Sequence, residues 1–317
     1  VRTISFARFC RRAGGHESLF FVQGPPEAKE LLNRHGFPLV LLDGDISLKQ
    51  EAALMAEHAP ADVAFMEMLA CGPDRQRLLH RYANKVVVFD DLLDHEFVCD
   101  VVVCGQALPA YGNMGISARE TKFLTGLKYF LLDPAFLYDD EPVPPDKIQH
   151  ILVCLGGSTY EVALLKTAMA LARFPHFEAT FVLGYDETEI DKRLKRLLPD
   201  ARLVYGADNL ASLMREADLA VVSAGYLKIE AAVTRTPAVM VATQWHQIPL
   251  GEEFSRLCGM PFAGYMGFVT PEGLAGHIEA VSKSENRGVL IDTAAALVDG
   301  KGMARVYQAV FDLGDNV

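Results

Sequence analysis

The feature that most constrains the fold is a regular alternation of short apolar runs with segments of helical periodicity along most of the chain. Apolar runs at residues 19–22, 38–42, 63–66 and 86–89 are separated by more polar, amphipathic stretches. Continuous apolar runs of this length are typical of parallel strands buried on both faces, with helices as the crossovers between them. The pattern therefore predicts an α/β protein built on parallel sheets.

A change of composition near the middle of the chain divides it into two parts. Residues 138–146 read YDDEPVPPD, an acidic and proline-rich stretch that suits neither a helix nor a central strand. The alternation resumes beyond it, with strands expected at residues 151–155 and 219–223 among others. We therefore predict two Rossmann-like domains, one at residues 1–140 and one at residues 147–317.

The beginning of the sequence departs from the usual order of such a domain. A Rossmann-like domain starts with its first strand, which lies in the middle of the sheet. Here residues 1–14 have the pattern of a helix. Because a missing central strand would leave two unpaired sheet edges, which is costly, we expect the first strand to lie upstream of Val1.

Composition narrows the range of partners. The 317 residues include 41 acidic and 30 basic side chains, for a formal net charge of −11. This charge disfavours nucleic acid and anionic membranes as partners, and no apolar run reaches the ~18 residues of a membrane span. The six cysteines form no C-x-x-C pair. We expect reduced thiols in the cytoplasm, no zinc site and no cofactor, and the sequence does not indicate an oligomeric state.

The first candidate ligand site follows the predicted strand at residues 151–155. Gly156, Gly157 and Ser158 stand between this strand and a predicted helix. Glycines at the end of a parallel strand let the backbone approach a ligand, and a helix N-terminus offers unpaired N–H groups to an anion. An ordinary tight turn explains the same residues.

The second candidate site follows the predicted strand at residues 219–223. Ser223, Ala224 and Gly225 are small, so backbone N–H groups there could contact a phosphate. Glu230 follows in the next helix, where its carboxylate could accept hydrogen bonds from ribose hydroxyls. A solvated helix residue is the alternative interpretation of Glu230, and its apolar neighbours weaken that alternative.

Two further places offer polar groups at strand ends. His246 and Gln247 follow a predicted strand together with Trp245, the only tryptophan of the chain. Open α/β sheets bind ligands at this edge, but a surface loop is an equal alternative. Asp90 and Asp91 end another predicted strand, where they are either a helix cap or site carboxylates.

Several other motifs are absent or better explained as structure. The chain has neither a G-x-x-x-x-G-K-[ST] loop nor a G-x-G-x-x-G motif. The D-G-D at residues 43–45 is interpreted as a turn rather than a metal-binding pair. The spacing of the following histidines is not that of metal ligands, so we assign them no site: His16, His35, His58, His80, His95, His150, His176 and His277.

A set of short motifs, spread over nearly the whole chain, matches one known family in order and spacing. The residues that carry the match are Phe89-Asp90-Asp91, Cys99-Asp100, Tyr111, Gly126 to Tyr129, Leu131-Leu132, Gly156-Gly157-Ser158, Ser223-Ala224, Glu230, Gln247, Val298 to Gly302 and Arg305. They resemble the GT-B class of nucleotide-sugar enzymes. Within that class they are most similar to the UDP-2,4-diacetamido-2,4,6-trideoxy-β-L-altropyranose hydrolases of the pseudaminic acid pathway and their spore-coat-polysaccharide relatives.

This resemblance implies two GT-B-type domains facing a cleft, with UDP held by the second. The implied activity is hydrolysis of a UDP-linked acetamido sugar, with release of UDP, in bacterial nonulosonic acid or surface-glycan biosynthesis. The residues expected to bind the nucleotide are Gly156, Gly157, Ser158, Ser223, Ala224, Gly225 and Glu230. The residues expected to bind the sugar are Arg2, Asp90, Tyr111, Tyr129, His246 and Gln247.

The sequence also departs from the family pattern. The family opens with G-x-G-H-x-x-R; Arg2 matches the arginine, so the implied catalytic histidine lies upstream of Val1. Residues 66–68 read MEM in place of an Asp-His-Tyr-like stretch. His246 stands where the family tends to have asparagine before the glutamine, and Cys104 and Gly105 stand where it tends to have asparagine after the Cys-Asp strand. Two alternatives therefore stay open: a GT-B glycosyltransferase that uses a UDP-sugar donor, and a nucleotide-sugar-binding protein without activity.

Overall fold

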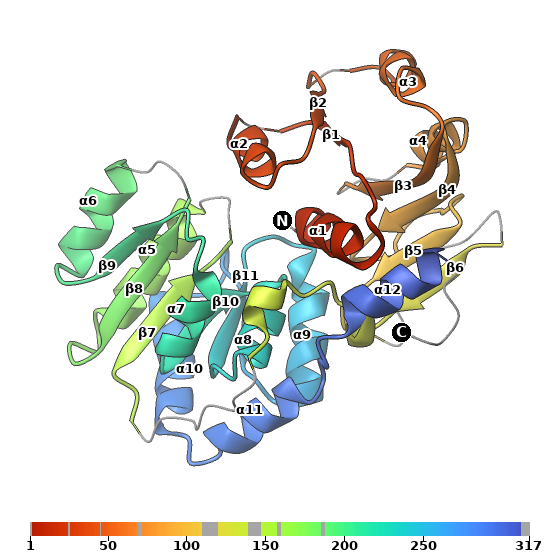
Figure 1. Cartoon of the computed structure of the whole chain (residues 1–317). Coiled ribbons are helices and arrows are strands. Elements are labelled where there is room, and N and C mark those ends of the chain that lie inside the picture. The colour runs from red at the N-terminus through yellow and green to blue at the C-terminus, as the bar shows by residue number, and fades with distance from the viewer. Residues whose placement is uncertain are drawn as a thin grey trace. The chain divides into compact units, whose positions relative to one another are not determined.

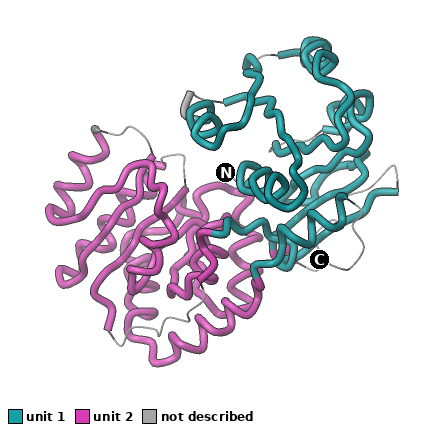
Figure 2. The backbone as a smooth tube through the Cα atoms, in the orientation of Figure 1, with its two compact units in different colours: residues 1–106, 110–134, 300–317 teal, residues 107–109, 135–299 magenta. Residues whose placement is uncertain are grey.

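The computed structural model describes residues 2–24, 26–44, 46–68, 72–109, 120–138, 147–156, 160–184 and 188–311 (Figure 1). Contacts divide the chain into two compact units (Figure 2). Unit 1 comprises Val1–Gln106, Ala110–Pro134 and Gly300–Val317, and unit 2 comprises Ala107–Pro109 and Ala135–Asp299. Every strand pairing in the described residues is parallel, which confirms the predicted α/β class.

Unit 1 contains a two-stranded sheet, β1-β2, and a four-stranded sheet in the order β3-β4-β5-β6. Its elements are α1 (Arg2–Gly14), β1 (Phe20–Val22), α2 (Pro26–Arg34), β2 (Leu39–Leu41), α3 (Leu48–Ala56), β3 (Ala61–Glu67), α4 (Pro73–Leu79), β4 (Ala83–Phe89), β5 (Val101–Cys104), β6 (Lys122–Thr125), the 3-10 turn η1 (Leu127–Tyr129) and α12 (Gly302–Phe311). A second 3-10 turn, η2 (Pro134–Phe136), stands where the two units meet along the chain.

Helix α1 packs against side chains from both sheets of unit 1. Its Phe6 belongs to an apolar cluster with Phe89 of β4, whereas its Ile4 belongs to a second cluster against which Phe20 of β1 packs. β1 and β3 lie in separate sheets, and within the described ranges each pairs with a single strand. The first strand expected from the Rossmann pattern is not among the elements of those ranges.

The last described helix, α12, belongs to unit 1, although the sequence pattern placed all of residues 147–317 in one domain. Its apolar face packs into the cluster that contains Val87 of β4. The ammonium of Lys85 donates to the carbonyl of Val310 at 2.5 Å, and Arg305 donates to the carbonyl of Lys128 at 2.9 Å. The observed units differ from the predicted domains because the apolar side chains of α12 pack against residues of unit 1. No local sequence pattern shows this packing. Residues 139–146 of the expected linker lie outside the described ranges.

The close approach of α12 to the chain near Phe130 requires a glycine at position 302. A Cβ added there would overlap the carbonyl oxygen of Phe130. We expect Gly302→Ala to lower the free energy of unfolding by about 2 kcal/mol, because backbone cannot yield as a side-chain tip does. The matched control is Gly276→Ala in a helix of unit 2, where a Cβ meets nothing within 4 Å. That change is expected to stabilise by up to about 1 kcal/mol. Urea denaturation measures both, and equal effects would contradict the packing argument.

Unit 2 has one six-stranded sheet in the order β12-β11-β10-β7-β8-β9. Its elements are β7 (His150–Cys154), α5 (Glu161–Leu171), β8 (Glu178–Leu183), α6 (Thr188–Leu197), β9 (Arg202–Tyr205), α7 (Leu210–Glu216), β10 (Leu219–Ser223), α8 (Leu227–Val233), β11 (Ala238–Ala242), α9 (Gln247–Cys258), β12 (Phe262–Tyr265), α10 (Pro271–Lys283) and α11 (Arg287–Ala295). Helices cover both faces of the sheet, as Figure 1 shows, so strand residues such as Val221 and Val239 are fully buried. The strand order reverses between β7 and β10, the place where such sheets bind ligands.

Candidate functional site

The candidate site lies at the carboxyl ends of β7, β10 and β11 in unit 2. These three strands are neighbours in one parallel sheet, so the turns that follow them lie along the same edge. The first residues of the three candidate turns of unit 2 therefore lie along this one edge of the sheet.

The turn after β7 begins at Gly156, whose φ of +112° is strained for any residue with a side chain. Gly156 is exposed, and a Cβ added to it would meet nothing within 4 Å. Gly157 and Ser158 lie outside the described ranges. Burial raises the pKa of the neighbouring Cys154 to about 12, so its thiol stays protonated at neutral pH and is no nucleophile.

The turn after β10 is stabilised by hydrogen bonds from a buried lysine. The side chain of Lys228 is fully buried, and its ammonium donates to the carbonyls of Ala224 at 2.8 Å and Gly225 at 2.7 Å. The N–H of Ala224 donates to the carbonyl of Val241 at 2.8 Å, so this group is not available to a phosphate, contrary to the sequence interpretation. Sequence reasoning missed Lys228, although a lysine within an otherwise apolar helix was a visible signal.

Glu230 connects the second turn with the first. Its negative charge is one of the causes that raise the pKa of Cys154, so its carboxylate lies within Coulombic reach of the end of β7. Glu230 lies on α8, is partly buried and makes further interactions within the protein. Glu230 therefore lies near β7 and β10, where the strand order reverses, and its side chain is not fully solvated.

Gln247, the first residue of α9, has an amide with a defined orientation. Its Oε1 accepts from the backbone N–H of Thr243 at 2.9 Å and from the Thr243 hydroxyl at 3.1 Å. Because a backbone N–H can only donate, the oxygen must face Thr243. The NH2 group then faces Gly225, where an added Cβ would lie 3.5 Å from Nε2. The neighbouring His246 is partly exposed and makes no side-chain cap to α9.

In unit 1, Arg2 is engaged by two carboxylates. Its Nε donates to Glu67 at 2.6 Å and its Nη1 donates to Asp91 at 2.8 Å. The hydroxyl of Thr3 donates to the other oxygen of Glu67 at 2.7 Å. Residues at the start of α1 and at the ends of β3 and β4 therefore form one polar cluster, which the sequence had not predicted.

Asp90 is buried and stabilises a turn. Its Oδ1 accepts from the backbone N–H groups of Leu92 at 2.9 Å and Leu93 at 2.6 Å, and Leu93 has a positive φ of 54°. Its Oδ2 lies 3.8 Å from Nδ1 of His95, which lies 3.2 Å from Asp94. Asp90 thus caps a turn and not a helix, since β5 is the element that follows β4 in the described residues, and a histidine lies beside it.

Of the other expected sugar contacts in unit 1, one packs against the core and one lies outside the described ranges. The ring of Tyr129 packs against the core cluster, with the ammonium of Lys128 5.1 Å from its centre. Tyr111 lies outside the described ranges. Two residues that depart from the family pattern, Met66 and Cys104, are core side chains, and burial raises the pKa of Cys104 to about 12.

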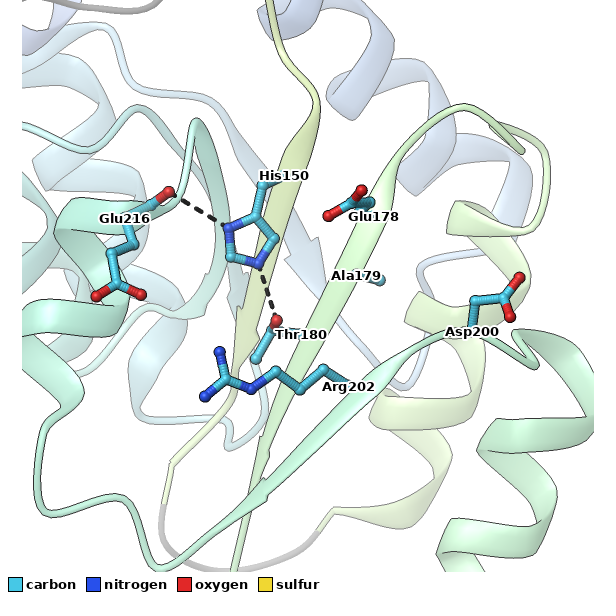
Figure 3. Close-up of a pocket in the computed structure, with 7 residues that line it drawn as sticks. All are labelled: His150, Glu178, Ala179, Thr180, Asp200, Arg202 and Glu216. Carbon is cyan, nitrogen blue, oxygen red and sulfur yellow. Dashed lines mark hydrogen bonds between the residues drawn. The ribbon is translucent and has the colours of Figure 1, made fainter.

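A separate hollow of about 470 Å³ lies at the opposite, amino-terminal edge of the unit 2 sheet (Figure 3). The Nδ1 of His150 contacts the carbonyl of Glu216 at 3.3 Å, and its Nε2 contacts the Thr180 hydroxyl at 2.8 Å. Both ring nitrogens are thus engaged within the protein. Because doubly wound sheets bind ligands at the carboxyl ends of their strands, this hollow is not the candidate site.

No group of three or more His, Cys, Asp or Glu side chains in the described residues could hold a metal ion. No described helix is both long and apolar enough to cross a membrane.

No family model matches the chain. The spore coat polysaccharide biosynthesis protein SpsG of Bacillus subtilis is 27% identical over 201 residues, which cover 61% of this chain and 59% of that protein. The chain thus spans about three fifths of that relative's length. MurG of Acinetobacter baumannii has a TM-score of 0.64 at 16% identity, over 98% of this chain and 95% of its own. The UDP-GlcNAc 2-epimerase of Neisseria meningitidis, solved with UDP-GlcNAc bound, has a TM-score of 0.63 at 9% identity, over 98% of this chain and 96% of its own. These likenesses show that the fold is GT-B-like.

Proposed function

We propose that this protein binds a UDP-linked sugar at the carboxyl edge of the unit 2 sheet and hydrolyses it with release of UDP. The observation that carries the proposal is the amide of Gln247, whose NH2 group Thr243 directs toward Gly225. An oriented donor beside the glycine of the β10 turn, at the reversal of strand order, suits the oxygens of a diphosphate.

Each part of the ligand has an assigned contact. Glu230 accepts hydrogen bonds from the ribose hydroxyls, and Gln247 donates to the phosphate that carries the sugar. The other residues assigned to the diphosphate are Gly156, Gly157, Ser158, Ser223 and Gly225. Arg2, Asp90, Tyr111, Tyr129 and His246 are kept as predicted sugar contacts.

The proposed reaction is a displacement by water. Water attacks the anomeric carbon, the bond from that carbon to the phosphate oxygen breaks, and UDP leaves with the bonding electrons. A general base takes the proton of the attacking water, and the resemblance assigns this role to the histidine of the family's G-x-G-H-x-x-R motif. Donors aimed at the departing phosphate stabilise the charge that develops there.

The relatives support this class of substrate and pathway. SpsG is named for spore coat polysaccharide biosynthesis, and the Neisseria meningitidis epimerase binds UDP-GlcNAc. We therefore propose that this protein acts in bacterial surface-glycan biosynthesis, with nonulosonic acid synthesis as the branch that the sequence motifs favour.

The reaction is tested by measuring UDP released from a panel of UDP-linked acetamido sugars. Release in buffer alone supports the hydrolase. Release only after an alcohol acceptor is added would instead identify a glycosyltransferase. Tight binding without release would identify an inactive nucleotide-sugar-binding protein, and the absence of both would refute the proposal.

The ribose contact gives a separate prediction. Glu230→Gln is expected to weaken UDP binding about tenfold, because a charge-assisted hydrogen bond contributes about 1.5–3 kcal/mol and an amide oxygen contributes less. Calorimetry with UDP and with 2′-deoxy-UDP measures the effect. If Glu230 holds the ribose, wild type loses affinity for the deoxy compound, and the variant loses little more.

The control is Glu178→Gln at the amino-terminal end of β8, on the opposite edge of the same sheet. It removes the same charge and should leave UDP affinity unchanged. Equal losses in the two variants would show a general charge effect and no ribose contact.

A further inference from the structure

Three aromatic side chains form a cluster at the carboxyl ends of β11 and β12, which we call the aromatic platform: Trp245, Tyr265 and Phe268. The rings of Trp245 and Tyr265 are stacked, with centres 4.2 Å apart and planes inclined by 27°. Phe268 meets both edge-on, at 5.6 Å and 5.7 Å. Trp245 is 59% exposed and Phe268 is 77% exposed, so much of the platform faces solvent.

The turn that follows Tyr265 and carries Phe268 is held in place by a lysine of α5. The ammonium of Lys166 donates to the carbonyls of Met266 at 2.7 Å, Gly267 at 3.3 Å and Val269 at 2.9 Å. A Cβ on Gly267 would overlap the ring of Tyr265, so only glycine permits this ring position. Exposed aromatic rings on a fixed turn are ready for a ligand, because little conformational entropy is lost when they bind.

The platform adjoins the candidate site on two sides. Trp245 lies in the loop that the hydrogen bonds between Thr243 and Gln247 close. A hydrogen bond with Tyr160, the residue that precedes α5, raises the pKa of Tyr265 above its usual value. The platform is therefore connected to the turn after β11 and to Tyr160 at the start of α5.

The strand order indicates which part of a nucleotide sugar reaches the platform. Glu230, the proposed ribose contact, lies close enough to the end of β7 for its charge to raise the pKa of Cys154. Gln247 follows β11, which lies on the other side of β10 from β7. A ligand with its ribose at Glu230 and its diphosphate at the β10 turn thus directs its glycosyl end toward β11 and β12. Neighbouring strands lie about 4.8 Å apart, which is close to the width of one sugar ring.

We propose that the aromatic platform binds the sugar ring of the UDP-sugar, with the exposed face of Trp245 stacked on the C–H groups of the pyranose. This inference rests on the proposed function and adds the residues that select the sugar. A pyranose presents a flat face of C–H groups, for which an aromatic face is the complementary surface. The net charge of −11 disfavours an anionic lipid surface as the occupant.

The test uses the full chain, whose single tryptophan is part of the platform. Fluorescence and calorimetry are recorded with UDP, UDP-glucose and UDP-N-acetylglucosamine. We expect the sugar nucleotides, and not UDP, to shift the Trp245 emission to shorter wavelength. Trp245→Ala should lower affinity for at least one sugar nucleotide about tenfold and change UDP affinity less than twofold. Trp245→Phe, which keeps a flat ring, should recover most of the loss.

The surface control is Val289→Ala on α11, which removes another exposed apolar side chain, 63% exposed, and should change nothing. Wild type that binds UDP but shows no sugar-dependent emission shift would overturn the platform alone. So would an equal loss of UDP and sugar-nucleotide affinity in Trp245→Ala, or a change of oligomeric state in that variant with affinity intact. Wild type that binds none of the three ligands would overturn the proposed function itself, and the platform with it.

Discussion

Replacing Gln247 by glutamate is expected to lower the affinity for UDP about 100- to 1000-fold. One carboxylate oxygen would keep the contact with the N–H of Thr243, and the other would face Gly225 in place of the NH2 group. The change removes a donor and places a negative charge against the diphosphate. Two like charges about 4 Å apart near a protein surface repel by about 4 kcal/mol, which lies near the upper end of the 2.7–4.1 kcal/mol that corresponds to this loss of affinity.

Calorimetry with UDP and with uridine measures this effect. Uridine has no phosphate, so its weaker binding should be nearly the same in wild type and Gln247→Glu. The matched control is Gln244→Glu, which adds the same charge to the same loop on an exposed side chain. A Gln247→Glu variant that binds UDP as wild type does would show that the amide does not face the phosphates.

Replacing Lys228 by methionine is expected to lower the free energy of unfolding by about 2–4 kcal/mol. Methionine fills a similar volume but leaves the carbonyls of Ala224 and Gly225 without their donor, and each unsatisfied buried group costs about 1–3 kcal/mol. The ammonium also lies 5.7 Å from the ring centre of Phe254, a contact that methionine cannot reproduce as a cation.

Urea denaturation measures the loss, and UDP binding reports on the turn itself. We expect the folded variant to bind UDP about tenfold more weakly, because the β10 turn loses the group that orients its carbonyls. Lys192→Met, on an exposed lysine of α6, is the control and should change neither quantity. A stable Lys228→Met variant with unchanged UDP affinity would refute the role assigned to this lysine.

Local patterns predicted the fold class because a parallel sheet buried on both faces requires continuous apolar strands. The same patterns placed Gly156, Ser223 and Gln247 at strand ends, and parallel pairing brings such ends to one edge. They left the role of Asp90 open between a helix cap and a site group; the structure shows that it accepts from the N–H groups of Leu92 and Leu93 in a turn that begins no helix. The patterns failed for the N–H of Ala224, which a neighbouring strand occupies.

The sequence by itself thus determined the α/β class and the turns at the carboxyl edge of unit 2, because both follow from periodicity and residue type along a short window. Only the tertiary structure decided that α12 packs in unit 1, that the amide of Gln247 faces Gly225, and that Trp245, Tyr265 and Phe268 form one surface. The physical reason is that packing and hydrogen bonding select partners by position in space. Those partners lie on different elements, as Trp245 and Phe268 do, and no local periodicity records which elements will meet.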